Sequence, residues 1–453
     1  MAHIAPFRAL RYDPKKVSPQ DVVTQPYDKI SPELREAYYA ASPYNLVRII
    51  LGKQDAEDDD RNNPYTRAAQ YFHSWRRDGV FLQDSLPAIY LYAQRFTAPG
   101  TTLQMERRGF IALGKVEDYS AGVVFRHEQT LSKPKADRLE LLRSTRAHFG
   151  QIFMLYSDPA NEVEGILSTN APPDTEVRDE YGVHHRVWKI SDSALLNLIQ
   201  GKMRDKKLII ADGHHRYETA LNYRNERRST AASDSARGFP RQYSSEKSFL
   251  NKQEEEIAPY ELAMMTFVNM DSPGLLILPT HRVVCGLTTF SAEKLAESAS
   301  SYFNVTKIEG QVGAPHATTL LRDAGKNGAA ILAVMQDHSL LLDKPKGVGT
   351  KIFGNLSIRQ QALDVVRLHK CLLEGALGLS EESIRNQENI RYIRDAEEAL
   401  TQVYSGDANV AFLMNAARME QVRDVAFAGE VMPQKSTDFF PKLLSGFAIY
   451  ALD

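Results

Sequence analysis

The chain has 453 residues, of which 43% are hydrophobic and 25% are charged, and its 55 Lys and Arg residues nearly balance 57 Asp and Glu residues. This composition is typical of a globular protein and excludes a collagen, a disulfide-stabilised scaffold and a wholly disordered chain. The formal net charge of −2 provides no overall basic field for nucleic acid or an anionic membrane, so we expect neither as a partner.

The sequence contains two cysteines, Cys285 and Cys371, and no CxxC motif. Isolated cysteines fit a reducing compartment and offer no zinc site. The first dozen residues lack the order of a signal peptide, and no apolar run approaches the roughly 18 residues that a membrane-spanning helix needs. We therefore expect a cytoplasmic protein.

Hydrophobic patterning predicts alternating helices and strands along the chain. Near the N-terminus, Ser31-Pro32 begins a capped helix, and a second helix runs from Pro64 to Gly79. Apolar and aromatic runs predict strands at 88–93, 108–113, 151–156, 186–190, 207–211, 263–268 and 275–278. Further helices are predicted over 135–147, from Asp192, over 217–227 and near 356–377. This alternation predicts a mixed α/β (α+β) fold.

Composition suggests three segments along the chain. Residues 1–158 form an N-terminal α/β segment, and the polar, Pro-containing stretch 159–182 is a plausible boundary. A βαβα passage occupies 183–285, and the C-terminal α/β segment covers 286–453. Within the central segment, residues 228–256 are rich in Ser, Lys and Glu and poor in apolar residues, which predicts a flexible insertion.

The sharpest chemical signal is Asp212-Gly213-His214-His215-Arg216, which follows a predicted strand and begins a predicted helix. Such a junction presents unsatisfied backbone N–H groups and the positive end of the helix dipole, and both favour anions. Gly213 permits close approach of a phosphate, and Arg216 supplies a fork of donors for phosphate or carboxylate. Asp212 can ligate Mg²⁺ or accept a proton. In the alternative interpretation, Asp212 only caps the helix and the histidines face solvent.

This segment, followed by Tyr-Glu-Thr-Ala, resembles the signature of the ParB/sulfiredoxin superfamily and is closest to that of the free serine kinases. Over nearly its full length the chain also resembles the family called domain of unknown function 1015. That second resemblance lies in the segments 25–31, 127–130, 136–139, 279–283 and 432–437. The resemblances imply a ParB/sulfiredoxin-like central unit with additional N- and C-terminal α/β segments.

Two departures from the superfamily pattern narrow the expected chemistry. Sulfiredoxins carry a nucleophilic Cys where this chain has His214, so we do not expect thiol-based repair. ParB proteins carry Gly-Glu-Arg-Arg, whereas Gly213-His-His-Arg provides less positive charge, and DNA clamping is not expected either.

A second candidate is the pair His127-Glu128. It begins like a zincin motif, but position 131 is Leu, so the second His is missing. Glu128 can instead act as the base that takes a proton from a substrate hydroxyl, with His127 binding the substrate beside it. The alternative is a pair at a strand edge that makes only surface hydrogen bonds.

Two further groups have an anion-binding composition. His281 and Arg282 follow an apolar run and can bind a carboxylate or phosphate, or they can simply form an exposed strand end. Lys435, Ser436 and Thr437 bring a cation and two hydroxyls together, or they form a turn before the last strand. We assign all five residues to substrate binding.

These residues predict nucleotide-dependent phosphoryl transfer on a small hydroxylated metabolite. The resemblance implies serine or phosphoserine as that metabolite, with Mg²⁺ and ADP or ATP as cofactors, and no metal ligand is assigned. The residues assigned to phosphate or nucleotide binding are Gly213, His215 and Arg216, and those assigned to catalysis are Glu128, Asp212 and His214. The alternative is a nucleotide- or phosphate-binding regulatory protein without turnover.

Overall fold

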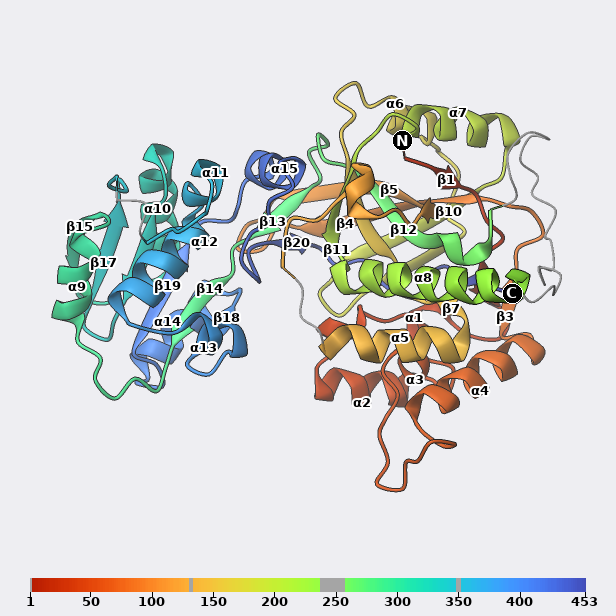
Figure 1. Cartoon of the computed structure of the whole chain (residues 1–453), viewed down its shortest axis with the longest axis horizontal. Coiled ribbons are helices and arrows are strands. Elements are labelled where there is room, and N and C mark those ends of the chain that lie inside the picture. Colours follow the sequence, from red (N-terminus) through yellow and green to blue (C-terminus); the bar gives the residue numbers. More distant parts are fainter. Residues whose placement is uncertain (1, 130–132, 237–256, 348–351) are drawn as a thin grey trace. The chain divides into compact units, whose positions relative to one another are not determined.

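A computed structural model describes residues 2–129, 133–236, 257–347 and 352–453 of the chain (Figure 1). It divides the chain into two compact units, and each unit has its own sheet. Unit 1 comprises Met1–Phe125, Thr130–Leu276 and Pro441–Asp453, and unit 2 comprises Arg126–Gln129 and Ile277–Phe440. The predicted mixed α/β fold class is confirmed. Within the described ranges, no helix has the length and apolar character needed to cross a membrane.

Unit 1 is built around a nine-stranded sheet. Its strand order is β6 (Val124–Phe125), β11 (Leu208–Asp212), β8 (Ile152–Tyr156), β12 (Leu262–Asn269), β5 (Gln104–Lys115), β4 (Ile89–Thr97), β10 (His184–Ile190) and β9 (Thr175–Arg178), with β1 (Ile4–Ala5) paired to β5. The pairs β12–β8 and β11–β6 are parallel, whereas β5 pairs antiparallel with both β4 and β12. Every residue of β8 and β12 is buried, as expected for strands whose two faces are both covered.

Helices lie on both sides of this sheet. In Figure 1, α6 (Glu162–Ile166) and α7 (Ser193–Met203) lie on one side, and α8 (His214–Ala236) lies on the other. Helix α5 (Lys133–Thr145) packs against α8, and α4 (Pro64–Arg77) packs against α5. The same unit contains α1 (Pro19–Val22), α2 (Pro32–Ala41) and α3 (Val47–Ile50), and the short strand pairs β2 (Leu10–Tyr12) with β3 (Phe81–Gln83) and β7 (Ala147–His148) with β21 (Tyr450–Ala451).

Helix α4 shows how local sequence sets these elements. Asn63 and Thr66 form a capping box, in which each side chain accepts a hydrogen bond from the backbone N–H of the other residue. The apolar positions of the helix recur at helical spacing and are buried in the core: Ala68, Phe72 and Trp75. The predicted helix that begins at Pro64 is therefore present for the reasons the sequence gives.

Unit 2 has a six-stranded sheet in which all pairs are antiparallel. Its strand order is β15 (Asn304–Glu309), β17 (His338–Asp343), β16 (Ile331–Val334), β19 (Val410–Met414), β14 (His281–Val284) and β18 (Ile390–Ile393). The longer helices of this unit are α9 (Ala292–Ser300), α10 (Ala314–Ala324), α14 (Ala396–Tyr404) and α15 (Met419–Phe427). Strand β20 (Asp438–Phe440) pairs with β13 (Leu276–Leu278).

The helix predicted near 356–377 differs from the structure. In place of one continuous helix, the structure has α11 (Ile358–Gln361), α12 (Asp364–Arg367) and a π-helix over Leu368–Ala376. The backbone leaves the helical conformation at Leu363, whose ψ is 133° and whose side chain is buried. Hydrophobic periodicity registers such a buried leucine but does not reveal a break in the backbone.

The sequence also predicts a flexible insertion over 228–256 and a division of the chain into three segments. Residues 228–236 continue α8, and the rest of the predicted insertion, 237–256, lies outside the described residues. Strands of the unit 1 sheet come from both 1–158 and 183–285, so these two predicted segments share one sheet. The division into three segments stays a prediction from composition.

Candidate functional site

The Asp212–Arg216 turn connects β11 to α8 in unit 1. Residues 208–211 of β11 are buried, and Asp212 follows them directly before the helix begins at His214. Gly213 has a φ of +88°, a left-handed conformation that residues with a Cβ rarely adopt. The predicted order of strand, glycine turn and helix start is thus present. It places the N–H groups of the first helical turn at this end of β11.

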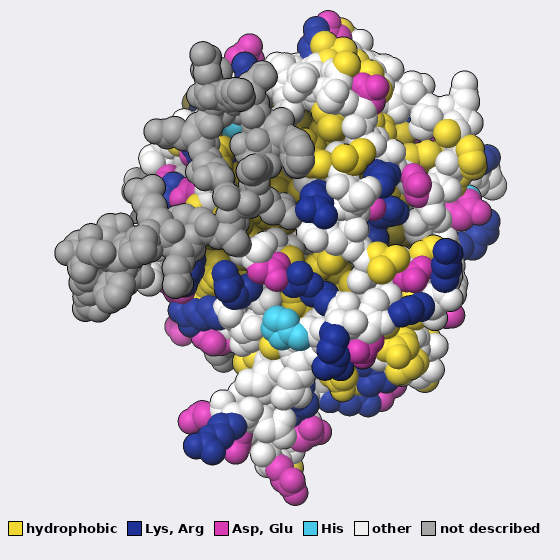
Figure 2. Space-filling model, turned by 90° about the vertical axis from the view of Figure 1, so that its right-hand side faces the viewer, with side chains coloured by type: hydrophobic (Ala, Val, Ile, Leu, Met, Phe, Trp, Pro, Cys, Tyr) yellow, Lys and Arg dark blue, Asp and Glu magenta, His cyan; other side chains and the backbone are white. Residues whose placement is uncertain are grey.

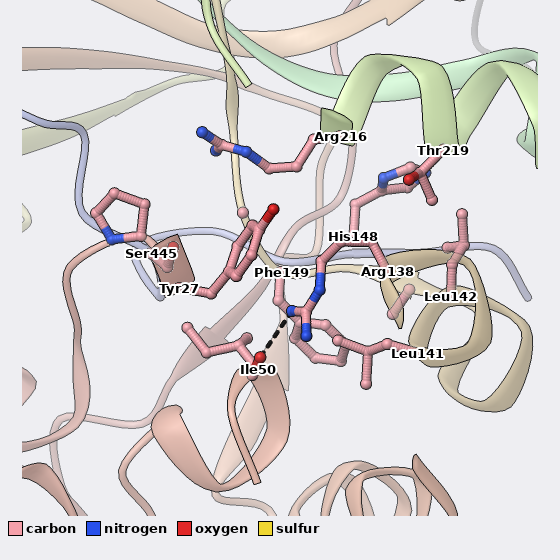
Figure 3. A pocket seen from close by; sticks show the side chains of 13 residues that line it. Tyr27, Ile50, Arg138, Leu141, Leu142, His148, Phe149, Arg216, Thr219 and Ser445 are labelled. Carbon is pink, nitrogen blue, oxygen red and sulfur yellow. Dashed lines mark hydrogen bonds between the residues drawn. The ribbon is translucent and has the colours of Figure 1, made fainter. Parts of the chain in front are cut away.

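The side chain of Arg216 folds back over Gly213. A Cβ at position 213 would lie 2.9 Å from Nε of Arg216 and 3.0 Å from its Cζ, so any other residue there would displace this guanidinium. Nη1 of Arg216 donates a hydrogen bond to the carbonyl oxygen of Gln151, and Nη2 lies 3.6 Å from Oδ1 of Asp212. With 15% of its side chain exposed, Arg216 is a largely buried cation at the start of α8 (Figure 3).

Lys442, which the sequence analysis did not single out, forms an ion pair with the same carboxylate. Its Nζ lies 2.9 Å from Oδ2 of Asp212, and the two side chains are 11% and 21% exposed. Burial acts to raise the pKa of Asp212, but the charges of Lys442 and Arg216 outweigh it and hold that pKa well below its usual range. Asp212 is therefore ionised at neutral pH and holds two cations.

Buried polar side chains of the sheet fix the backbone around Lys442. Gln94 donates from Nε2 to the carbonyl oxygen of Lys442 at 2.8 Å, and Arg107 donates to the carbonyl oxygen of Pro441 and to Oε1 of Gln94. Burial lowers the pKa of Arg107 to about 10, so it remains a cation at neutral pH. The backbone N–H of Leu444 donates to the hydroxyl of Tyr92 at 3.3 Å. No local sequence pattern indicates a lysine placed in this way.

His214 and His215 occupy the first turn of α8, and both are partly buried. The structure therefore brings all five residues of the predicted motif together with Lys442. The turn collects the charges of Arg216 and Lys442, one carboxylate and a helix N-terminus. Because positive charge is in excess there, an anion is the ligand that this arrangement suits.

The second set of predicted residues lies in unit 2. We call His127, Glu128, His281, Arg282, Lys435, Ser436 and Thr437 the Glu128 group. Nε2 of His127 lies 2.7 Å from Oγ1 of Thr437, and the backbone N–H of Lys435 donates to Oε1 of Glu128 at 3.0 Å. These bonds join segments about 300 residues apart in the sequence, as their separations of 310 and 307 positions show.

Arg282 and His281 support this group from β14. The guanidinium of Arg282 is 1% exposed and donates from Nη2 to the carbonyl oxygens of Gln434, at 3.3 Å, and Lys435, at 3.0 Å. Burial lowers the pKa of Arg282 to about 10, which leaves it charged at neutral pH. Burial also lowers the pKa of His281 to about 4, and its Nδ1 accepts a hydrogen bond from the backbone N–H of Met414. The two residues are therefore internal parts of unit 2.

The structure thus places the predicted residues in two groups. The Asp212–Arg216 turn belongs to unit 1, and the Glu128 group belongs to unit 2. Among the described residues, no group of three or more His, Cys, Asp or Glu side chains is arranged to hold a metal ion.

Comparison with known proteins assigns the chain to a family. Residues 4–366 match the family described as "Protein of unknown function (DUF1015)", and the chain belongs to this family. No curated protein matches the sequence.

Several solved structures are similar to the chain at low identity. A conserved hypothetical protein from Pyrococcus furiosus is 13% identical, with 73% of this chain and 92% of that chain covered and a TM-score of 0.32. A free serine kinase in complex with AMP is 14% identical, with 70% and 83% covered and a TM-score of 0.31. SbnI with a C-terminal truncation, from Staphylococcus aureus, is 11% identical, with 74% and 85% covered and a TM-score of 0.33.

Proposed function

We propose that the protein binds a nucleoside di- or triphosphate at the Asp212–Arg216 turn and transfers a phosphoryl group to or from a small hydroxylated metabolite. The observation that carries this proposal is the pair of cations, Arg216 and Lys442, that one carboxylate holds at the first turn of α8. The excess positive charge and the helix dipole both favour polyphosphate oxygens. The Asp-Gly-His-His-Arg motif shared with free serine kinases supports ADP or ATP as the nucleotide and serine or phosphoserine as the metabolite.

Each residue of the turn has a role in this proposal. The N–H groups of the first turn of α8 hold phosphate oxygens, and His215 and Arg216 add side-chain donors. Gly213 gives the phosphate room to approach, while its own N–H donates to Oδ1 of Asp212 at 2.6 Å. His214 is proposed to donate to the phosphoryl group during transfer. Asp212 positions the cations, because a carboxylate whose pKa is held low is a poor proton acceptor. Mg²⁺ would neutralise charge between the phosphates. It would be bound largely by the nucleotide itself, since this ion commonly keeps waters and few protein ligands.

Glu128 is proposed to activate the acceptor hydroxyl. The hydroxyl oxygen attacks the terminal phosphorus, the bond to the leaving phosphate oxygen breaks, and Glu128 takes the hydroxyl proton. Its carboxylate is partly exposed and is oriented by the N–H of Lys435, which suits a base that must meet a substrate. The metabolite is proposed to be bound by four other members of the Glu128 group: His127, Lys435, Ser436 and Thr437. The buried His281 and Arg282, also predicted to bind it, are instead proposed to support the segment that contains Lys435. The cytoplasm, where the unpaired Cys285 and Cys371 would stay reduced, is the proposed location.

The test measures the transfer of a labelled phosphoryl group between serine and ADP or ATP. It is run in both directions with Mg²⁺ present. Glu128→Gln keeps the shape of the side chain but cannot accept the proton, so turnover is expected to fall by about 10²–10⁴-fold. Nucleotide affinity should stay constant, because the proposal assigns the phosphates to the Asp212–Arg216 turn. Gln129→Ala, at an exposed neighbouring position, is the matched control. Unchanged turnover in Glu128→Gln removes Glu128 from the mechanism.

A binding protein without turnover is the second candidate. The ion-paired state of Asp212 favours it, because a carboxylate engaged by two cations is arranged for binding rather than for proton transfer. A nucleotide that raises the melting temperature of the wild-type protein shows binding. If it does so while no phosphate is transferred with any nucleotide or metal, the regulatory function replaces the enzyme.

A further inference from the structure

A cavity in unit 1 lies beside Arg216, and Arg216 is the one residue of its lining to which the proposed function gives a role (Figure 3). We call it the Arg216 cavity. Its walls come from the N-terminal segment, α5, β7 and the residues after it, α8 and the C-terminal segment. Its polar lining residues are Tyr27, Arg138, His148, Arg216, Thr219 and Ser445, and the rest of the lining is mostly aliphatic or aromatic.

The charged side chains in the lining of the Arg216 cavity are those of two arginines. The lining contains Arg138 and Arg216 and, among the described residues, no Asp or Glu. Arg138 is 10% exposed, and its guanidinium stacks 4.2 Å from the ring centre of Tyr27. Burial lowers the pKa of His148 to about 4, so this imidazole is neutral at pH 7 and adds no charge. Arg138 is ion-paired with Asp137, and Arg216 lies beside Asp212, so both have a carboxylate partner outside the lining. Because Asp212 also holds Lys442, positive charge is in excess beside Arg216, and this excess favours an anion.

Two hydroxyls in the cavity are suited to a ligand with oxygen atoms. Thr219 is 4% exposed, and its Oγ1 is buried without a hydrogen-bond partner among the described residues. Such an unsatisfied group is costly, and a ligand oxygen would remove that cost. The hydroxyl of Tyr27 points toward Arg216 in Figure 3. Because burial raises the pKa of Tyr27, this phenol stays protonated and can donate.

The size of the cavity limits the ligand. Its volume is about 70 Å³. One water needs about 10–15 Å³, so the cavity has room for several waters or for a small organic molecule. The aliphatic lining suits a short carbon body better than a phosphate dianion, which loses more hydration on burial. An ammonium group would meet two guanidinium groups, and the described lining itself contains no carboxylate.

We propose that the Arg216 cavity binds a short hydroxy carboxylic acid, of the class of lactate or glycerate. The carboxylate faces Arg216 and the hydroxyl of Tyr27, and the hydroxyl of the ligand bonds to Oγ1 of Thr219. The absence of an acid from the described lining selects the hydroxy acid over the amino acid of the same size. Arg216 is shared with the proposed phosphate site, but the inference does not require phosphoryl transfer and stands whether or not the protein catalyses it.

The test is a calorimetric titration of the full chain with lactate, alanine and inorganic phosphate. Lactate and alanine form a matched pair, because both have six non-hydrogen atoms. They differ in that lactate carries a hydroxyl where alanine carries an ammonium group. Lactate is expected to bind in the millimolar range, as suits so small a ligand, and alanine about tenfold or more weakly. Thr219→Val keeps the shape of the side chain and should weaken lactate binding by about 3- to 10-fold.

A second measurement separates a ligand contact from a structural role of Thr219. The unliganded Thr219→Val variant should melt no lower than the wild type, because a buried hydroxyl without a partner has been replaced by an apolar group. Thr230→Val, on the exposed part of α8, is the control and should bind lactate as the wild type does. Unchanged lactate affinity in Thr219→Val would overturn the proposal. The proposal would also be overturned if lactate did not bind up to about 50 mM, if alanine bound with equal affinity, or if phosphate bound more tightly than lactate.

Discussion

At position 213, both the backbone conformation and the packing of Arg216 favour glycine. The φ of +88° favours glycine, and the space that a Cβ would occupy is taken by the guanidinium of Arg216. Arg216 in turn lies against Gly150, where a Cβ would meet its Nη1 at an ordinary contact distance of 3.5 Å. The placement of this cation therefore depends on glycine at position 213 more than at position 150.

Gly213→Ala is expected to lower the free energy of unfolding by about 1–3 kcal/mol, because alanine is strained at this φ and its Cβ displaces Arg216. Phosphate or nucleotide binding at the turn should weaken with it. Gly201→Ala is the matched control, since Gly201 lies within α7 and a Cβ there meets no atom within 4 Å. The free energy of unfolding of Gly201→Ala should rise by about 0.4–1 kcal/mol. Chemical denaturation measures both, and equal stabilities of Gly213→Ala and the wild type would contradict the strain argument.

The Lys442–Asp212 pair predicts a pH-dependent contribution to stability. Because the pKa of Asp212 is lowered in the folded state, its ionised form stabilises the fold at any pH above its unfolded value, about 4. That contribution is lost as the pH falls below about 4 toward the folded value. Lys442→Met removes one cation, so this variant should melt below the wild type at pH 7. The difference should narrow as the pH falls below 4.

Melting temperatures of the two proteins from pH 7 to pH 2.5 measure the prediction for Lys442→Met. Lys202→Met is the control, because Lys202 forms an exposed ion pair with Glu162, and exposed pairs contribute little. A difference that stays constant through the acid range would mean that Lys442 acts through packing and not through the charge of Asp212.

At the scale of elements, the sequence predicts those helices and strands whose ends and faces are set by neighbouring residues. The helix from Pro64, the strand before Asp212 and the helix start after Gly213 all follow from caps, turn residues and apolar spacing, and the structure contains them. The interruption at Leu363 has no such local signal, because a buried side chain and not a Gly or Pro marks it.

Elements far apart in the chain explain why the candidate site was only partly predictable. The motif at Asp212 is contiguous, so its five residues could be found together in the sequence. Lys442 reaches the same carboxylate across 230 positions, and Arg282 reaches the backbone of Lys435 across 153. A single sequence carries no pairing information at such distances, and buried polar contacts leave no periodic pattern. The Arg216 cavity was missed for the same reason, since its lining runs from Pro26 to Ser445.

At the scale of the whole molecule, the chain leaves and re-enters unit 1. After unit 2 ends at Phe440, the last thirteen residues, Pro441–Asp453, return to unit 1. On the face shown in Figure 2, Lys and Arg side chains are interspersed with Asp and Glu, in keeping with the nearly balanced charge of the sequence.

The returning segment supplies both function and core to unit 1. It carries Lys442 and pairs its strand β21 with β7. Its large apolar side chains are buried: Leu443, Leu444, Phe447, Ile449 and Leu452. Burying each is worth about 1.5–3 kcal/mol, so the five together match the 5–15 kcal/mol by which a typical domain is stable. Unit 1 should therefore not remain folded without this segment.

Truncation after Phe440 tests that conclusion, because separate probes report on the two units. Both tryptophans, Trp75 and Trp188, belong to unit 1, and Cys371 belongs to unit 2, where it is fully buried. The truncated chain is expected to show the tryptophan emission of an unfolded environment, because the core of unit 1 loses the buried side chains of its last segment. Cys371 should stay protected from a thiol reagent, since burial both shields it and raises its pKa to about 11. Native tryptophan emission in the truncated chain would show that unit 1 holds its core without the segment. Rapid labelling of Cys371 would show that unit 2 depends on it as well.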